Sequence, residues 1–169
     1  MASDDSQTIL SHAAVTRVRE ALLHAGLAGD ITIMPEATHT AQAAAAALAC
    51  DVAEIAKSII FRAQDGRAVL VITSGSNRVD DKKVAQLIGQ PLGKADADFV
   101  RAQTGFVIGG VAPVAHLLPP IALMDEDLLR YSAIWPAAGH PNTMFRIAPN
   151  DLARVAQAQV ADIALRKNT

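Results

Sequence analysis

The chain has 169 residues, of which 51% are hydrophobic and 4% aromatic, and its formal net charge is −2. Its apolar content is sufficient for an aliphatic core, and its single cysteine excludes an internal disulfide. No apolar run approaches the roughly 20 residues of a membrane span, and the acidic, polar start is not typical of a signal peptide. These features predict one cytoplasmic domain spanning residues 1–169, with no membrane partner.

Charge is unevenly distributed along the chain. From Lys57 to Arg101 there are eight basic and five acidic residues, which leaves seven basic and twelve acidic residues elsewhere. The middle segment therefore carries about +3 and the flanks about −5. A local basic face for a polyanion and an ordinary solvated surface both explain this distribution. The net charge does not indicate a nucleic-acid-binding protein, and no DNA partner is predicted.

The first part of the chain is predicted to combine short helices with a short strand. Apolar residues at helical spacing predict a helix over residues 12–27, and residues 31–34 predict a strand. Thr40 is expected to cap an alanine-rich helix, because alanine has the highest helix propensity and threonine satisfies a free N–H group. Asp51 is expected to begin a second short helix over residues 51–57.

The rest of the chain predicts a mixed α/β fold. Two β-branched apolar runs, residues 58–63 and 68–73, flank the turn sequence QDGR and predict a hairpin. Further helices are expected over residues 80–87, 96–103 and 149–159, further strands over residues 105–110 and 121–124, and a short helix capped by Asp125. Because strands and helices alternate, we expect a mixed β-sheet covered by helices, with residues 133–138 and 143–147 completing the chain.

Few residues have the spacing of a known catalytic or metal site. The histidines and the cysteine lack the spacing of zinc ligands, and no metal or cofactor is predicted; these residues are His12, His24, His39, His116, His140 and Cys50. The loop 74–78, SGSNR, is either a phosphate-binding loop or, more simply, a strand-to-helix turn. Cys50 lies in an apolar helical context that favours a small buried residue over a nucleophile.

Two features remain as candidates for function. Lys57 stands where a helical pattern changes to an apolar strand, so its side chain either extends to the surface or points into a cleft. The segment 105–113, GFVIGGVAP, ends an apolar run with two glycines and a proline. This is either a turn or a backbone surface that a ligand can approach closely.

These segments, in this order, resemble the YbaK/ProX family of free-standing relatives of the editing domain of bacterial prolyl-tRNA synthetase. The likeness covers about residues 30–155, and its most specific elements are Lys57 and the GxxxP loop of residues 109–113. The resemblance implies a strongly curved mixed sheet surrounded by helices. It also implies hydrolysis of the ester of mischarged tRNA(Pro), with transient association with prolyl-tRNA synthetase.

The resemblance implies a catalytic group and a set of substrate-binding residues. The predicted catalytic residues are Lys57, for positioning and electrostatics, and Gly109 and Gly110, whose N–H groups would stabilise the oxyanion. The predicted substrate-binding residues are Ser58, Val111, Ala112, Pro113, His116, Ala137, Gly139, His140 and Met144. The two histidines are equally well explained as exposed loop residues.

The expected substrate carries a small aliphatic residue, alanine or 2-aminobutyrate. In relatives that clear cysteine from tRNA, the matching segment carries a serine and an aspartate, whereas this chain has Ala137 and Met144. Two alternatives remain open: a catalytically silent module that binds tRNA or a small ligand, and an esterase for a small metabolite. Turnover on a panel of mischarged tRNAs separates these three hypotheses.

Overall fold

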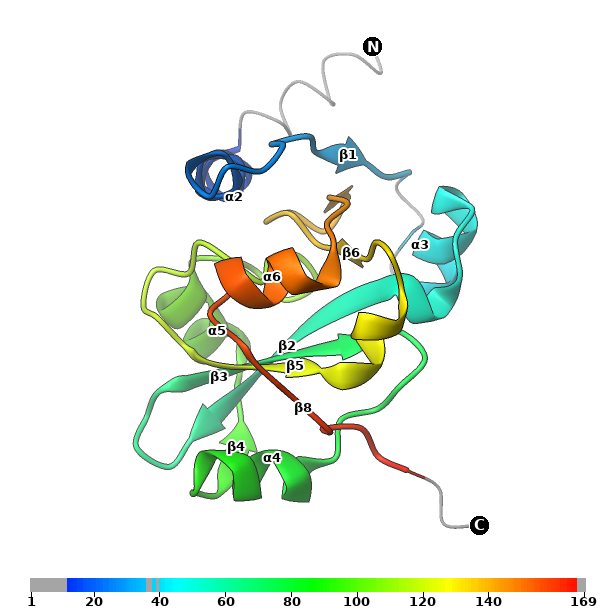
Figure 1. The fold of residues 1–169 in the computed structure, drawn as a ribbon. Coiled ribbons are helices and arrows are strands. Elements are labelled where there is room, and N and C mark those ends of the chain that lie inside the picture. Colours follow the sequence, from blue (N-terminus) through cyan, green and yellow to red (C-terminus); the bar gives the residue numbers. More distant parts are fainter. Residues whose placement is uncertain (1–11, 36–37, 39, 167–169) are drawn as a thin grey trace.

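A six-stranded mixed β-sheet forms the centre of the protein, seen in a computed structural model that describes residues 12–35, 38 and 40–166 (Figure 1). Its strands are β2 (Ile55–Ala63), β3 (Ala68–Ser74), β4 (Leu92–Lys94), β5 (Ile121–Asp125), β6 (Trp135–Pro136) and β8 (Gln159–Ala161). The order is β4-β2-β3-β5-β8, and β6 pairs with β2. Strand β2 pairs antiparallel with β3 and β4, whereas β3 with β5, β5 with β8 and β2 with β6 are parallel. The predicted mixed sheet is confirmed.

Three of the helices begin after a capping residue that the sequence supplies, a threonine or an aspartate. The helices are α2 (Ala13–His24), α3 (Ala41–Leu48), α4 (Asp81–Ile88), α5 (Ala97–Thr104) and α6 (Pro149–Val155), with the 3-10 turns η1 (Val52–Glu54) and η2 (Glu126–Arg130). The side chain of Thr40 accepts a hydrogen bond from the N–H of Ala43, which confirms the predicted cap of α3. Asp80 and Asp96 cap α4 and α5 in the same way.

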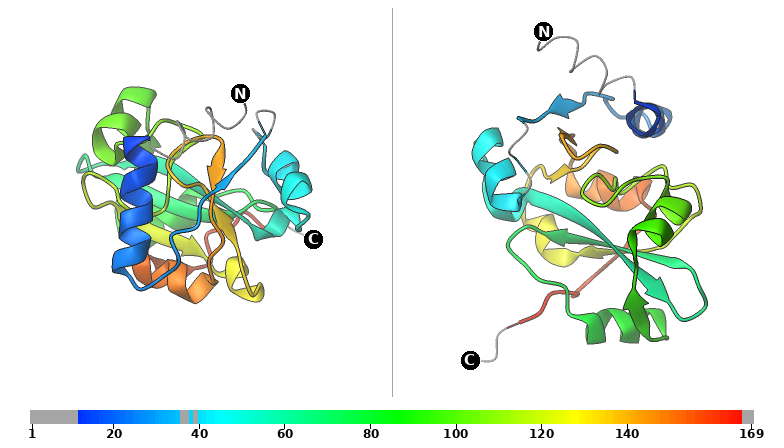
Figure 2. Two further views of the ribbon diagram at one scale, coloured as in Figure 1. Left: turned by 90° about the horizontal axis from the view of Figure 1, so that it is seen from above. Right: turned by 180° about the vertical axis from the view of Figure 1, so that it is seen from behind.

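Helices cover both faces of the sheet (Figures 1 and 2). Leu70 and Ile72 of β3 pack in one cluster with residues of α2, α5 and α6, whereas Val69 and Val71 pack in another with residues of α4. Every residue of β3 is buried, as expected for a strand that is covered on both faces. A smaller sheet pairs β1 (Thr32–Ile33) with β7 (Thr143–Met144), beside the N-terminal end of β2.

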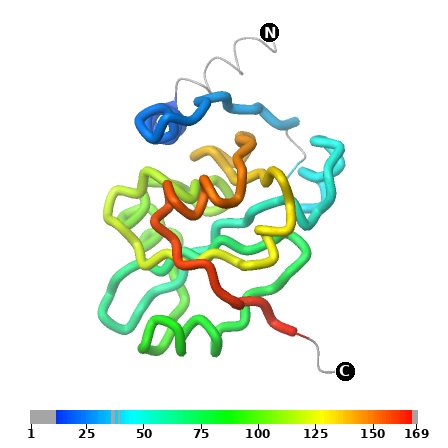
Figure 3. Tube along the Cα trace, viewed as in Figure 1, coloured from blue at the N-terminus to red at the C-terminus, as the bar shows by residue number. Residues whose placement is uncertain are grey.

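The chain returns to the sheet after α6. The last helix was predicted to reach residue 159, but it ends at Val155, and Gln157 has a positive φ of 51°. In Figure 3 the orange-to-red segment then runs from the α6 side of the sheet toward α4. This segment contains strand β8, which pairs with β5. The sequence did not indicate β8, because the edge of β5 with which it pairs exists only in the folded sheet.

Two predicted elements are wrong. Residues 51–57 were expected to be a helix, but only Val52–Glu54 form a 3-10 turn, and β2 begins at Ile55 because this segment pairs with β3 and β6. Residues 105–110 were expected to form a strand, but they form a loop without strand pairing. Gly105 ends α5 with a φ of 79°, and Gly109 has a φ of 93°, so both glycines turn the chain.

Strand β4, in the connection after α4, was not predicted, because its three residues carry no strand pattern.

Within the described ranges, none of the helices has both the length and the apolar character needed to span a membrane.

Candidate active site

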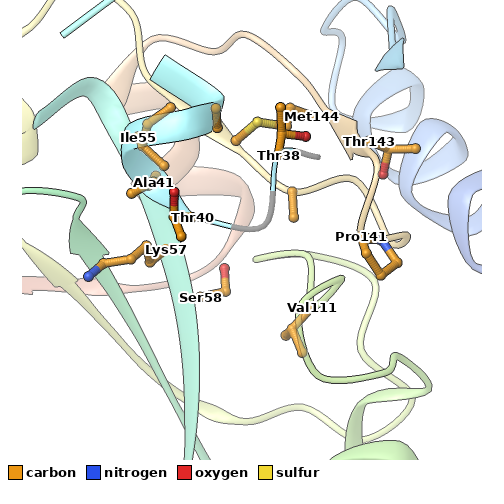
Figure 4. A pocket seen from close by; sticks show the side chains of 14 residues that line it. Thr38, Thr40, Ala41, Ile55, Lys57, Ser58, Val111, Pro141, Thr143 and Met144 are labelled. Carbon is orange, nitrogen blue, oxygen red and sulfur yellow. The ribbon is translucent and has the colours of Figure 1, made fainter. Parts of the chain in front are cut away.

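A cavity of about 200 Å³ lies beside β2, between α3, the loop after α5 and the segment around β7 (Figure 4). Six residues predicted from the sequence line it: Lys57, Ser58, Gly109, Val111, Ala137 and Met144. Residues from four separate parts of the chain therefore meet at one place. The cavity also has lining residues that the sequence did not indicate, among them Thr38, Ala41, Ile55, Pro141 and Thr143.

Lys57 contributes to the wall of the cavity, but its ammonium group points away from the Ser58 side of β2 (Figure 4). Its Nζ atom donates a hydrogen bond of 3.3 Å to the carbonyl oxygen of Asn77. Burial lowers the pKa of the Lys57 ammonium below its usual range, and the charge of Arg78 lowers it further. The side chain is thus a half-buried cation held at a fixed position beside the cavity.

A polar network that the sequence did not predict holds Asn77 in place. The Asn77 side chain donates to carboxylate oxygens of Asp125 and Asp127, each at 2.8 Å. Asp125 is fully buried and also accepts hydrogen bonds from the Thr73 hydroxyl and the Ser74 N–H group. The loop 74–78 is therefore a turn built around a carboxylate, which does not favour a phosphate at its centre.

The outer part of this network is an ion pair. Arg166 donates to Asp127 at 2.8 Å, and this bond holds the pKa of the Asp127 carboxyl below its usual range. Asp125 was predicted only as the cap of a short helix, and it does accept a hydrogen bond from the N–H of Asp127. Asp125 also accepts hydrogen bonds from the loop 74–78, and the sequence did not indicate this role because the loop lies about fifty positions earlier in the chain.

Ser58 points to the side of β2 opposite Lys57, toward Val111 (Figure 4). Successive side chains of a strand point to opposite faces, so Lys57 and Ser58 leave β2 on opposite sides although both residues line the cavity. The Ser58 hydroxyl is buried and has no hydrogen-bond partner in the described part of the chain. A buried polar group without a partner costs free energy, and a bound ligand could supply the missing hydrogen bond.

The GxxxP loop brings main-chain N–H groups to the cavity. Gly109 and Val111 line it, and within the described residues their N–H groups have no hydrogen-bond partner. These groups are therefore available as donors to a developing oxyanion. Ala112 and Pro113 are buried behind them and do not line the cavity.

Gly110 has a different environment from Gly109. Its N–H group donates to the carbonyl oxygen of Val107, so it is already used within the turn. A Cβ atom on Gly110 would lie 2.9 Å from main-chain atoms of His140 and Pro141, whereas one on Gly109 would meet nothing within 4 Å. The glycine at position 110 thus permits close packing of two loops.

An apolar wall closes the cavity opposite β2. Ala137 and Met144 face one another across an isolated antiparallel bridge, and Met144 is buried. Ala41 of α3 also lines the cavity, next to Ile55 of β2 (Figure 4). Thr143 is fully buried, and its hydroxyl donates to the carbonyl of His140 at 2.8 Å.

The predicted histidines and Gly139 do not line the cavity. His116 bonds to the carbonyl oxygen of Ala112 at 2.6 Å through Nε2 and packs edge-on against Phe106, so it shapes the GxxxP loop from behind. His140 lies near His12, with ring centroids 5.8 Å apart. A Cβ atom on Gly139 would approach the main chain of Ala14 to 2.9 Å, so this residue lies where the loop meets α2.

The described residues contain no group of three or more His, Cys, Asp or Glu side chains suited to a metal ion; His39 lies outside the described residues. Cys50 packs against the cluster behind α3 and does not line the cavity. Burial, followed by the charge of Glu54, raises the pKa of its thiol, which disfavours the reactive thiolate.

The comparison with family models decides the assignment: the model for the Aminoacyl-tRNA editing domain matches residues 35–155. The chain belongs to this family. The editing domain is 29% identical over 131 residues to the uncharacterized protein YwhH of Bacillus subtilis (strain 168), a match that covers 78% of this chain and 83% of that protein. These findings confirm the resemblance to YbaK-like editing domains and make aminoacyl-tRNA the substrate class.

Two further relatives carry more specific names. A crystal structure described as "a putative trans-editing enzyme for prolyl tRNA synthetase" is 41% identical, with a TM-score of 0.86 over 91% of this chain and 98% of that one. The "Putative Cys-tRNA(Pro)/Cys-tRNA(Cys) deacylase EbsC" of Enterococcus faecalis (strain ATCC 700802 / V583) is 23% identical over 76% of this chain and 79% of that protein. The editing domain thus shares the mixed α/β fold of this family, and the family supports the general assignment as an aminoacyl-tRNA deacylase.

Proposed function

We propose that this editing domain hydrolyses the ester that joins a small aliphatic amino acid, alanine or 2-aminobutyrate, to tRNA(Pro). The observation that carries the proposal is the cavity beside β2, which combines the Ser58 hydroxyl with N–H groups of Gly109 and Val111 that have no partner among the described residues. Its volume of about 200 Å³ is smaller than a typical drug-sized pocket and suits a small aminoacyl group.

The proposed chemistry requires no protein nucleophile. An aminoacyl ester is already activated, so water or a hydroxyl of the terminal ribose attacks its carbonyl carbon. The N–H groups of Gly109 and Val111 stabilise the oxyanion, and the Ser58 hydroxyl donates or accepts a hydrogen bond at the reacting group. The ammonium of Lys57 contributes positive charge beside the strand and orients the substrate from that side.

The apolar wall supports the choice of amino acid. Ala137 and Met144 offer no polar side chain to the substrate, whereas relatives of the cysteine-clearing type carry polar residues at these positions. Apolar pockets discriminate a single methylene by only about 1–3 kcal/mol, so we expect some activity on cysteine as well. The relatives named for tRNA(Pro) and for prolyl-tRNA synthetase support tRNA(Pro) as the carrier and transient association with the synthetase.

The test is a deacylation assay on tRNA(Pro) charged with alanine, 2-aminobutyrate, cysteine or proline. We expect fastest release of alanine or 2-aminobutyrate, and a decrease in kcat/KM of about 100-fold or more in Lys57→Ala, because electrostatic stabilisation of the transition state is lost. Lys82→Ala, which removes an exposed lysine of α4 that does not line the cavity, is the matched control and should retain full activity.

The outcomes separate this proposal from its alternatives. Stoichiometric binding of tRNA without ester loss across the panel would indicate a silent binding module. Equal rates on a short activated ester and on the tRNA ester would indicate a small-molecule esterase. Unchanged activity in a folded Lys57→Ala protein would exclude the role given to Lys57.

A further inference from the structure

Strand β2 has a short unpaired edge next to the cavity. One edge pairs with β3 from Ala56 to Arg62, but the other pairs only with β6 at Ile55–Ala56 and with β4 at Phe61–Ala63. Between these two partners, residues 57–60 have no strand beside them on this second edge in the described part of the chain. The edge is therefore open over about four residues, and strands β6 and β4 bound it at its two ends.

The hydrogen bonds of β2 show which main-chain groups face this open edge. The carbonyl of Ile55 accepts from Gly75, and the N–H of Ala63 donates to Arg67, so the main-chain groups of these two β2 residues face β3. Main-chain groups alternate between the two edges along a strand. The N–H and C=O groups of Ser58 and Ile60 thus face the open edge.

A second cavity of about 180 Å³ lies along this edge. It shares Ser58, Gly109 and Val111 with the first cavity, so the two cavities adjoin at these residues. Its other lining residues are mainly aliphatic: Ile59, Ile60, Ala95, Val100 and Ile108. Ile108 stands at the rim with 61% of its surface exposed, the largest exposed fraction among the large apolar residues described.

Two basic side chains, Arg62 and Arg101, lie near the second cavity on β2 and α5. Ser58, Ile60 and Arg62 alternate along one face of β2, and the Arg62 guanidinium lies 5.0 Å from the ring centroid of Phe99. Arg101 is exposed on α5, whereas Lys94 is paired with Phe61 across the β2–β4 ladder, so its side chain lies on the opposite face from Ser58, Ile60 and Arg62. The nearby acidic residues are Asp96, whose carboxylate caps α5, and Asp98.

We propose that the second cavity and the open edge of β2 bind the terminal adenosine of tRNA, with Arg62 and Arg101 contacting the preceding phosphates. This assignment rests on the proposed function, which places the ester in the first cavity and hence the ribose that carries it at the junction near Ser58.

The chemistry of an open strand edge fits adenine. Each of Ser58 and Ile60 presents an N–H donor and a C=O acceptor side by side, and adenine carries an acceptor at N1 next to a donor at N6. The aliphatic lining supplies van der Waals contacts to the faces of the base. All mature tRNAs end in CCA, so this site reads a feature that every substrate shares.

The test uses the RNA tetranucleotide ACCA, which binds without any hydrolysis step. In NMR titrations we expect ACCA to shift the Ser58 and Ile60 amide signals, and ACCI, whose inosine reverses the donor and acceptor at these base positions, to bind about tenfold more weakly. Ile108→Asp should raise the Kd for ACCA and the KM for deacylation about tenfold with kcat unchanged, because a carboxylate then faces an apolar base and a phosphate.

Matched variants complete the design. Leu23→Asp changes a similarly exposed aliphatic residue of α2 and should leave both constants unchanged. Arg62→Ala should decrease the slope of log Kd against log salt concentration by about 0.7, the value for one phosphate contact on a single strand.

The outcomes distinguish this inference from the proposed function. Binding of ACCA with the expected shifts but no ester hydrolysis would retain the adenosine site and reject the deacylase. Hydrolysis whose KM is unaffected by Ile108→Asp would overturn the adenosine site alone. Stronger shifts from an uncharged extended tetrapeptide than from ACCA would overturn it too, because the open edge would then be a peptide-binding site.

Discussion

The two sides of β2 at the candidate active site differ in how their polar groups are satisfied. On the Lys57 side, the network of Asn77, Asp125 and Asp127 has a hydrogen-bond partner for each side chain. On the Ser58 side, a buried hydroxyl and the main-chain groups facing the open edge have none among the described residues. The comparison indicates that the first side positions a charge, whereas the second receives the substrate.

The largest effect of a substitution is expected on the Lys57 side of β2, where the polar side chains have hydrogen-bond partners. Asp125→Ala leaves several buried donors without an acceptor, including the Ser74 N–H and the Asn77 amide, and should lower the free energy of unfolding by about 3 kcal/mol. It should also decrease kcat, because Asn77 then no longer holds Lys57. Urea unfolding and deacylation measure the two effects, with Asp151→Ala, at an exposed ion pair, as the control. Unchanged stability would show that the network is dispensable.

The next effect distinguishes the two glycines of the GxxxP loop. Gly110→Ala places a Cβ atom 2.9 Å from main-chain atoms and should lower the free energy of unfolding by about 2 kcal/mol. Gly109→Ala meets no neighbour and should cost about 1 kcal/mol through its positive φ alone. Its Cβ atom reaches the cavity, so we expect a larger loss of kcat/KM relative to its loss of stability. Equal ratios in both variants would assign the loop a purely structural role.

A smaller effect concerns pH and the support of this loop. Burial lowers the pKa of His116, and so does the charge of Arg17, against the opposing effect of the bond to Ala112. The folded-state pKa lies below the unfolded value of about 6.5, so the unfolded chain binds more protons, and stability decreases as pH falls below about 6.5. His140 acts in the same direction, through burial and then the charge of His12.

Unfolding measured between pH 7.5 and pH 5 tests this origin. His116→Gln retains a donor for the Ala112 carbonyl and should flatten the pH dependence of stability. The exposed His24→Gln variant should leave that dependence unchanged. If the two variants give the same slope, His116 is not the titrating group.

The smallest effect on stability is expected on the Ser58 side of β2. Ser58→Ala removes a buried hydroxyl that has no partner in the described residues, so the free energy of unfolding should change by less than about 0.5 kcal/mol. The value of kcat/KM should nevertheless decrease by about five- to tenfold, the worth of one hydrogen bond to the reacting group. A loss of stability without a loss of activity would mean that Ser58 has an internal partner and no contact with the substrate.

Local signals determined which segments form regular structure. The apolar runs around QDGR specified the β2–β3 hairpin, and the capping residues Thr40, Asp80 and Asp96 specified the starts of three helices. These elements depend on contacts within a few residues, which a sequence records directly. The resemblance to editing domains then identified six of the residues that line the cavity.

Only the tertiary structure decided where each of these residues points. The start of β2 at Ile55 places Ser58 toward the loop and Lys57 on the opposite side, because side chains alternate along a strand. The hydrogen-bond partner of Lys57, Asn77, and the packing neighbour of Gly110, His140, lie in distant segments, and no local pattern records such contacts. The sequence thus determined the elements and the candidate residues, while packing between distant segments determined the active-site geometry.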